Sequence, residues 1–166
     1  MGCILMKQKT VWLLSGIPGS GKSTWARNKA QQNGGVWCSR DEVRFSMLNE
    51  NDSYFNQEDR VFQSWIDNIN NALNMEDVKD VYVDATHLTD KSRNKTKRRL
   101  NHKNIDKIVN VIFDVPLEVC LERNAQRTGR AAVPEDVIKN MYNSFTFPNE
   151  VHTIYVDQRG VIFKSE

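Results

Sequence analysis

The sequence lacks long apolar segments, and its cysteines are few and scattered. Three cysteines, Cys3, Cys38 and Cys120, occur in 166 residues, and no two of them form a C-x-x-C pair. This spacing argues against a disulfide framework or a cysteine-based zinc site, and it fits a reducing compartment. No apolar run approaches the roughly 20 residues that a membrane-spanning helix needs. We therefore expect a cytoplasmic protein with buried or idle thiols and no membrane partner.

A strong excess of one charge is also missing. The formal net charge is +2 at pH 7, so any basic surface must be local. No internal repeat, low-complexity tract or Pro/Gly/Ser-rich linker divides the chain. Hydrophobic residues make up 39% of the chain, which is enough for a substantial core. We expect residues 1–166 to form a single domain.

Strand-like and helix-like segments alternate along the chain. Apolar runs rich in β-branched and aromatic residues predict strands at residues 10–15, 36–39, 78–83, 108–115 and 151–156. Helical periodicity and capping residues predict helices at residues 22–32, 41–48, about 62–73, 89–102, after Pro116, and 134–144. A turn at 159–160 leads into a short terminal strand. This order is typical of an α/β fold in which helices flank a parallel sheet of about five strands.

The most specific motif lies between the first strand and the first helix. Residues 16–23, GIPGSGKS, match the P-loop pattern G-x-x-x-x-G-K-[ST] in full. Such a loop points its N–H groups at phosphates, and the following helix adds its positive end. Lys22 is expected to neutralise the β- and γ-phosphates of ATP, and Ser23 to ligate Mg²⁺. The expected nucleotide-binding residues of the loop are Gly16, Pro18, Gly19, Ser20, Gly21, Lys22, Ser23 and Thr24. Thr24 would equally suit a packing role.

A candidate catalytic pair follows the second strand. Parallel sheets bind ligands at the carboxyl ends of their strands, so residues just after a strand face the phosphates. Asp41 is positioned to take the proton of an attacking hydroxyl. Arg44 lies three residues further on the same helix face and would hold an anionic part of the acceptor. The alternative is an N-cap aspartate in an i,i+3 ion pair.

A second acid ends the third strand. Asp84 stands where a Walker B carboxylate would support Mg²⁺ and the acceptor; the alternative is a turn residue at the end of a strand. Thr86 follows it and is assigned to the substrate side. His87 comes next, and we expect it to be an exposed loop residue rather than a catalytic base.

Two basic segments complete the candidate site. Arg123, Arg127 and Arg130 surround a glycine-containing loop and would close over the triphosphate as a lid; the alternative is that they are cations favoured at a helix C-terminus. A second basic run either forms a solvated helix face or holds the phosphates of a nucleic acid. This run consists of Lys91, Arg93, Lys95, Lys97, Arg98, Arg99 and Lys103. From it, Arg93 is assigned to substrate binding.

Taken in order, these motifs resemble a known family. Its pattern is found at residues 16–27, 39–41 with Arg44, 84–86, 113–116, 123–124 with Arg127, and 133–134. The chain resembles the kinase domain of the polynucleotide 5′-kinase family over nearly its whole length. The resemblance implies transfer of the γ-phosphate of ATP to a 5′-hydroxyl end of DNA or RNA. It also implies that Asp41 is the general base, Arg44 the acceptor-phosphate arginine and Arg127 the lid arginine, with Arg123 close by.

The chain departs from the family pattern in places. His87 stands where members often have asparagine, and the third-strand aspartate falls one residue earlier than in the phage kinase-phosphatase of this family. No Asp-x-Asp phosphatase signature is present, so a kinase module alone is expected. Two other functions stay open: a P-loop kinase for a nucleoside or another small molecule, and a nucleotide-binding switch without transfer activity. The pair of Asp41 and Arg44 argues against the switch, which needs no acceptor base.

Overall fold

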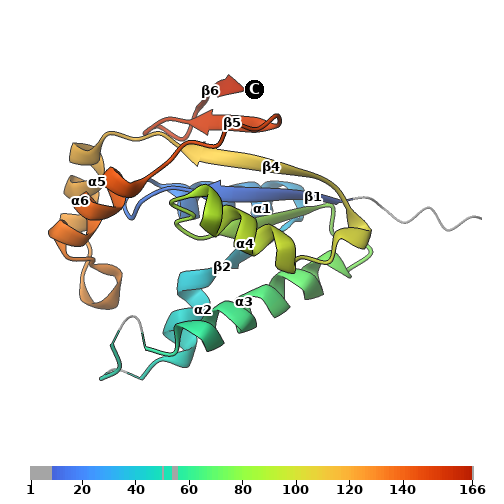
Figure 1. The fold of residues 1–166 in the computed structure, drawn as a ribbon, viewed down its shortest axis with the longest axis horizontal. Coiled ribbons are helices and arrows are strands. Elements are labelled where there is room, and N and C mark those ends of the chain that lie inside the picture. The colour runs from blue at the N-terminus through green and yellow to red at the C-terminus, as the bar shows by residue number, and fades with distance from the viewer. Residues whose placement is uncertain (1–8, 50, 54–55, 166) are drawn as a thin grey trace, which may run out of the picture.

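A six-stranded sheet forms the centre of the protein (Figure 1). The computed structural model describes residues 9–49, 51–53 and 56–165. In this part of the chain the strand order is β2-β3-β1-β4-β5-β6. The strands are β1 (Lys9–Ser15), β2 (Val36–Ser39), β3 (Asp80–Asp84), β4 (Ile105–Phe113), β5 (Thr153–Val156) and β6 (Ile162–Ser165).

The first five strands are parallel, as predicted, and the terminal strand makes the sheet mixed. β6 pairs antiparallel with β5. The connection is a tight turn, in which the Asp157 amide donates to the Val161 carbonyl at 3.0 Å. So short a connection allows only an antiparallel neighbour, because a parallel strand needs a crossover of a dozen residues or more.

Helices cover both faces of the sheet. They are α1 (Lys22–Asn33), α2 (Arg40–Met47), α3 (Glu58–Leu73), α4 (Asp90–Arg99), α5 (Leu117–Ala125) and α6 (Glu135–Ser144), with 3-10 turns η1 (His102–Asn104) and η2 (Gly129–Ala131). Thr89, at the start of the helix predicted for residues 89–102, caps α4, because its hydroxyl accepts from the Ser92 amide at 3.3 Å. The helix predicted to reach residue 102 ends at Arg99, since Leu100 is extended and packs into the core.

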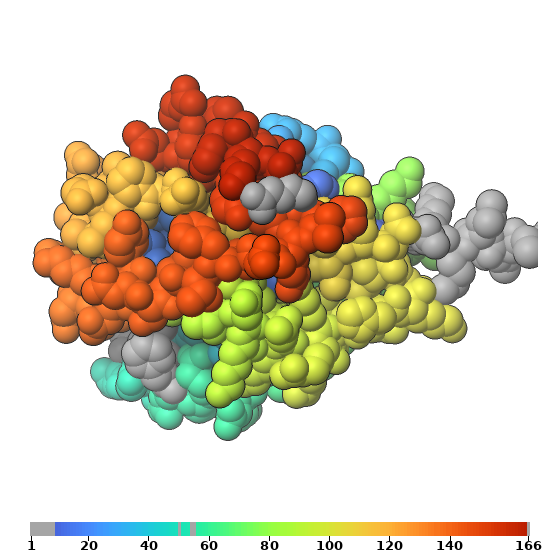
Figure 2. Space-filling view, turned by 45° about the horizontal axis from the view of Figure 1, so that its top comes forward, coloured from blue at the N-terminus to red at the C-terminus, as the bar shows by residue number. Residues whose placement is uncertain are grey.

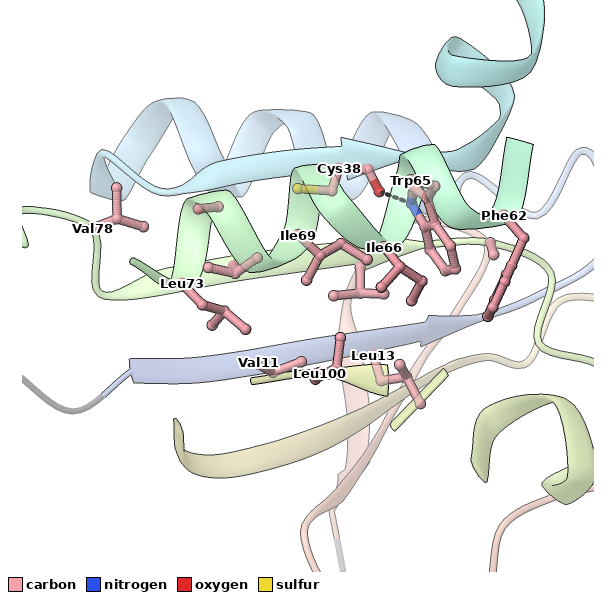
Figure 3. Close-up of a cluster of buried hydrophobic side chains, with 14 residues drawn as sticks. Val11, Leu13, Cys38, Phe62, Trp65, Ile66, Ile69, Leu73, Val78 and Leu100 are labelled. Atoms are coloured by element: carbon pink, nitrogen blue, oxygen red, sulfur yellow. Dashed lines mark hydrogen bonds between the residues drawn. The ribbon is translucent and has the colours of Figure 1, made fainter. Parts of the chain in front are cut away.

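On one face, α3 packs along β1, β2 and β3 (Figure 3). Its apolar side chains recur at helical spacing and point toward Val11 and Leu13, which alternation places on the same face of β1. Trp65 is fully buried, and its indole N–H donates to the Cys38 carbonyl at 2.9 Å. This packing fixes the position of α3, and with it Glu58, the first residue of the helix.

On the opposite face, α1 and α5 pack around a second cluster. Its members include Leu14, Trp25, Tyr82, Phe113 and Cys120. Both described cysteines, Cys38 and Cys120, are buried, as expected of idle thiols. Burial raises the pKa of Cys38 to about 12. Cys3 lies outside the described residues.

The carboxyl ends of the parallel strands gather at one end of the molecule. β4 points toward the end where α5 and α6 lie (Figure 1). The phosphate loop, the start of α2 and the segment after β3 follow the carboxyl ends of β1, β2 and β3. None of the helices in the described ranges has the length and apolar character needed to cross a bilayer.

Candidate active site

The loop between β1 and α1 has a backbone shaped for phosphate. Gly19 and Gly21 have φ angles of 86° and 87°, in the left-handed region that favours glycine. Of the α-helices in the described residues, α1 is the one with no acidic residue in its first turn. It also begins without a capping side chain. Its N-terminal N–H groups and its dipole therefore suit a bound anion.

Ser23 and Asp84 meet beside this loop. The Ser23 hydroxyl donates to Asp84 Oδ2 at 2.7 Å, and the Trp37 indole N–H donates to the same oxygen at 2.8 Å. Adjacent pairing of β1 and β3 brings the two residues together, and Asp84 is buried. A hydroxyl and a carboxylate are ligands that Mg²⁺ uses together with substrate phosphates. The described residues contain no cluster of three or more acids, histidines or cysteines, so the donor set fits a metal held mainly by phosphate rather than a protein cage.

Asp41 lies in the first turn of α2, beside Arg44. The alternative of an N-cap aspartate is wrong, because Ser39 caps α2 and its hydroxyl accepts from the Glu42 amide at 3.2 Å. The i,i+3 ion pair is present: Arg44 Nη1 donates to Asp41 Oδ1. The Asp41 side chain is 51% exposed, whereas that of Arg44 is 6% exposed. The Asp41 carboxylate is therefore accessible to a ligand, whereas the Arg44 guanidinium is buried beneath it.

Glu58 holds that guanidinium. It accepts from Arg44 Nε at 2.7 Å, from Arg44 Nη2 at 3.0 Å and from Arg40 Nη2 at 3.0 Å. Burial alone would raise the pKa of Glu58, but the hydrogen bonds and charges of Arg44 and Arg40 outweigh it and hold the pKa below its ordinary value. The role of Glu58 could not be predicted from the sequence, because the position of this residue depends on how α3 packs. The available signal was only that an acid begins a strongly amphipathic helix.

Three cavities surround the loop. The first, the central cleft, has a volume of about 390 Å³ and lies between α2, α6 and the segment around η2. Its lining includes Pro18, Lys22, Ser23, Asp41, Thr86, Arg127 and Arg130. Its other wall includes Val137 and Met141 of α6, which are half-buried beside the cleft. Thr86 reaches this position because the Gly16 amide donates to its carbonyl at 3.0 Å.

The other two cavities lie to either side. The inner pocket, of about 160 Å³, is lined by charged residues that include Lys22, Arg40, Asp41, Arg44, Glu58 and Asp84. The outer pocket, of about 440 Å³, is lined by residues that include Gly19, Ser20, Gly21, Thr24, Arg123, Arg127 and Gln158. Lys22 borders the inner pocket and the central cleft, and Arg127 borders the central cleft and the outer pocket. The expected site residues, except Arg93, therefore line connected space around the phosphate loop or pack against it.

The arginines of the expected lid contact backbone carbonyls. Arg123 donates to the carbonyls of Gly19 at 3.2 Å and Gln158 at 2.5 Å. Arg130 donates to the carbonyl of Leu48 at 3.0 Å, at the end of α2. Within the described ranges, neither these two nor Arg127 forms an ion pair with a carboxylate. Their positive charge therefore remains available to an anion.

The structure corrects the expectation for Arg93. Its side chain is only 1% exposed, and it lines none of the three cavities. The guanidinium donates to the carbonyls of His87 at 2.7 Å and Thr146 at 2.6 Å. It ties α4 to neighbouring loops, so an acceptor cannot reach it.

The expectation that His87 is exposed is also wrong. The residue is 4% exposed, with Nδ1 at 2.6 Å from the Leu14 carbonyl oxygen and Nε2 at 2.9 Å from the Thr96 hydroxyl. Because a carbonyl only accepts, Nδ1 carries the proton and Nε2 accepts from Thr96. Burial lowers the pKa of His87 to about 3, so the ring is neutral.

Comparison with known proteins identifies the fold family. A family model described as an AAA domain matches residues 11–148, which is most of the chain. The chain belongs to this AAA-domain family. Within this AAA domain, the complete phosphate loop and the surrounding cavities make the protein a kinase-type P-loop enzyme that uses a nucleoside triphosphate.

One curated relative of this AAA domain is a viral protein from Autographa californica nuclear polyhedrosis virus. It carries the provisional name of a bifunctional polynucleotide kinase/RNA ligase. It is 28% identical over 152 residues, which cover 85% of this chain and 21% of the relative. The chain thus spans about a fifth of that relative's length. This match confirms the resemblance to the polynucleotide 5′-kinase family.

Solved structures with the same fold include a chain of an RNA repair complex and two small-molecule kinases. A chain of the Pnkp1/Rnl/Hen1 RNA repair complex superposes with a TM-score of 0.68 and 24% identity, over 82% of this chain and 44% of that one. A gluconokinase from Sinorhizobium meliloti 1021 superposes with a TM-score of 0.59 and 22% identity, over 92% and 83%. A sugar kinase from Janibacter sp. HTCC2649 gives 0.62 and 18%, over 92% and 86%. These likenesses show the fold, which proteins with different acceptors share.

Proposed function

We propose that this P-loop kinase transfers the γ-phosphate of ATP to the 5′-hydroxyl end of DNA or RNA. One observation carries the proposal: Asp41 lies in the pocket that Lys22 borders and is held by Arg44, which Glu58 anchors in turn. A protein that only binds a nucleotide needs no such carboxylate on the acceptor side. The polynucleotide acceptor is supported by the relative named as a polynucleotide kinase/RNA ligase.

The nucleotide would be held by the loop and the lid. The outer pocket would take the nucleoside of ATP beside Thr24, and the loop N–H groups would hold the phosphates. Lys22 would neutralise the β- and γ-phosphates. Arg123 and Arg127 would approach the same phosphates from α5 and the segment after it, stabilising the charge that develops in transfer.

The metal site would be built by two side chains. Ser23 and Asp84, whose oxygens are 2.7 Å apart, would hold Mg²⁺. When bound, the ion would neutralise phosphate charge and orient the γ-phosphate. Asp84 is already oriented by the Trp37 indole, so the donor oxygens are arranged beforehand.

The acceptor hydroxyl would meet Asp41 where the central cleft joins the inner pocket. The Asp41 carboxylate would accept the hydroxyl proton as the oxygen forms its bond to the γ-phosphorus and ADP leaves. Arg44 would hold the first phosphate of the acceptor strand while Glu58 keeps its guanidinium in place. Thr86, which borders both cavities, would contact the same end of the strand.

A small-molecule acceptor is the second candidate. The inner pocket of about 160 Å³ is small and densely charged, as a polyol or a nucleoside would require. The fold is also that of a gluconokinase and a sugar kinase. The two functions differ in one respect: only a polynucleotide kinase gains affinity from acceptor phosphates beyond the first.

The deciding experiment offers both kinds of acceptor to one enzyme preparation. The protein is incubated with γ-labelled ATP, Mg²⁺ and 5′-hydroxyl oligonucleotides of DNA and RNA, in parallel with nucleosides and gluconate. We expect label on the oligonucleotides. Label on gluconate or nucleosides alone would make the protein a small-molecule kinase.

A matched pair of variants tests the proposed base. Asp41→Asn should reduce transfer by about 10²- to 10⁴-fold while ATP affinity stays unchanged, because the proton acceptor is lost and the nucleotide contacts remain. Glu42→Gln removes the neighbouring exposed carboxylate from the same turn of α2 and should leave transfer unchanged. Normal transfer by Asp41→Asn would overturn the assignment of Asp41.

A further inference from the structure

The basic run of α4 is divided by the fold into two groups. Arg93 and Lys97 are taken up by the protein, pairing with Asp90 at 3.0 Å and Glu150 at 2.7 Å respectively. Lys95 and Arg99 lie on an exposed face. Within the described residues, neither of these two forms an ion pair with a carboxylate. Lys95 and Arg99, like the exposed Lys91 and Arg98 of the same helix, therefore keep their charge for a ligand.

Lys95 and Arg99 converge on one aromatic ring of α3. The Lys95 ammonium lies 4.5 Å from the centroid of the Phe62 ring, and the Arg99 guanidinium carbon lies 5.8 Å from it. Arg99 also donates to the Gln63 side chain. Cation–π contact and this hydrogen bond restrain two long side chains that would otherwise move freely in solvent.

The same ring links these cations to the inner pocket. The Arg40 guanidinium carbon lies 5.3 Å from the Phe62 centroid, and Arg40 lines the inner pocket next to Asp41. Positive charge therefore continues from the pocket across the start of α3 to the exposed side of α4. Figure 2 shows α4, in lime, on the same face of the molecule as the teal segment that contains α2 and the start of α3.

The exposed cations of this row repel one another slightly, and a bound anion would relieve that repulsion. Lys95 and Arg99 are like charges at i,i+4, a spacing that destabilises a helix. The acid that bridges the row, Glu58, accepts from Arg40 and Arg44 at the pocket end only. Phe62 itself is 7% exposed, so its ring supports the cations and offers no open face for a base to stack on. The surface thus presents charge without the aromatic platform that stacks bases.

We infer that Arg40, Lys95 and Arg99 form a track for the sugar-phosphate backbone of the acceptor strand, leading away from its 5′ end. The inference rests on the proposed function and names the part of the enzyme that would distinguish a polynucleotide from a small acceptor. Contacts to phosphates position a strand without reading its sequence. The track therefore predicts that affinity depends on acceptor length and salt, and not on base identity.

The test removes the two exposed cations and varies the length of the acceptor. In Lys95→Ala/Arg99→Ala, KM should rise about tenfold for a 5′-hydroxyl oligonucleotide of roughly ten residues, because two phosphate contacts are lost. The slope of log K against log salt should become shallower by about 1.4, at about 0.7 per contact for a single strand. KM for ATP and for a nucleoside 3′-monophosphate, which is too short to reach the track, should not change.

The matched control removes two cations from the opposite end of the sheet. Lys79 and Lys107 are exposed; Lys107 pairs in register with Thr10 of β1, and the Lys79 carbonyl accepts from the Thr10 amide at 2.9 Å. Lys79→Ala/Lys107→Ala changes the net charge equally and should leave KM and the salt slope at the wild-type values. Equal effects of both double variants would mean that only net charge matters, and this would overturn the track.

Two further outcomes separate this inference from the proposed function. If the wild-type protein labels oligonucleotides but Lys95→Ala/Arg99→Ala keeps its KM and salt slope, the track is wrong and the function stands. If the wild-type protein labels no oligonucleotide, the proposed function fails first. Charge reversal in Lys95→Glu/Arg99→Glu should enlarge the effect, and a KM equal to that of the alanine variant would also contradict the track.

Discussion

Two groups of arginines face the phosphate loop from opposite sides, and they differ in what contacts them. On the side of α2, Arg40 and Arg44 both pair with the carboxylate of Glu58. On the side of α5 and η2, Arg123 and Arg130 donate to backbone carbonyls. A carbonyl leaves the charge of a guanidinium in place, whereas the single carboxylate shared by Arg40 and Arg44 offsets part of theirs.

The difference matches the charge of the two expected ligands. A nucleoside triphosphate carries several negative charges, and the arginines near it keep theirs. An acceptor hydroxyl is neutral and brings one nearby phosphate at most, and there the arginines are held in fixed positions by an acid. The lid side is therefore suited to binding charge, and the acceptor side to positioning a base.

The largest effect is expected from a substitution on the lid side. Arg127→Ala removes a guanidinium that borders both the central cleft and the outer pocket, and should lower kcat by about 10²- to 10³-fold. Arg127→Lys keeps the charge without the planar fork and should recover only part of the loss. Steady-state kinetics with labelled ATP measure both variants. A normal kcat in Arg127→Ala would remove Arg127 from the lid.

A second prediction concerns the buried His87, whose pKa is lowered in part by the charge of Arg40 on the acceptor side. Burial, helped by the charges of Arg40, Arg93 and Lys22, lowers the pKa of His87 to about 3 against the opposing effect of the Leu14 carbonyl. Below about pH 6.5 the unfolded chain binds a proton that the folded chain does not. As the pH is lowered from 6.5 to 4.5, His87 should therefore reduce the free energy of unfolding by about 1.4 kcal/mol per pH unit.

The variant His87→Asn isolates this contribution. Asparagine tolerates the positive φ of 40° at this position and does not titrate. We expect the variant to be less stable at pH 7 but to lose the part of the pH dependence that His87 causes. Urea unfolding at pH 7, 6 and 5 measures both proteins. Equal pH slopes in the two would show that His87 is not the titrating group.

The smallest effect is expected from a substitution on the acceptor side. Glu58→Gln keeps the shape of the side chain but removes the charge that anchors Arg44, so KM for the acceptor should rise about tenfold while KM for ATP is unchanged. Because the side chain is 27% exposed, solvent screens the pair and stability should fall by only about 1 kcal/mol. Asp59→Asn, at the next and exposed residue of α3, is the control. A raised KM for ATP instead would contradict the division between the two sides.

Local patterns were sufficient to predict much of this architecture. The phosphate loop, the five parallel strands and the cap of α4 at Thr89 each depend on residues that are neighbours in sequence. The meeting of Ser23 with Asp84 followed from strand ends alone, because both lie at the carboxyl edge of adjacent strands.

The remaining features depend on how distant segments pack, which spacing does not reveal. Glu58 reaches Arg44 because Trp65 and its neighbours fix α3 against the sheet. The rotation of α4 decides that Arg93 is buried while Lys95 is exposed, although both belong to one basic run. His87 is buried because its two ring nitrogens find partners on β1 and α4.

Gly19 allows the phosphate loop to pack closely against α5. A methyl group there would lie 2.4 Å from the carbonyl oxygen of Cys120, which is backbone and cannot swing aside. The backbone of the phosphate loop therefore packs directly against the backbone of α5. Arg123 belongs to the same helix as Cys120, so it is held in a fixed position relative to the loop. The position of Arg123 relative to the loop is therefore set when the protein folds. If the segment that carries Arg127 and Arg130 closes over a nucleotide, we expect it to bend after Ala125, where α5 ends.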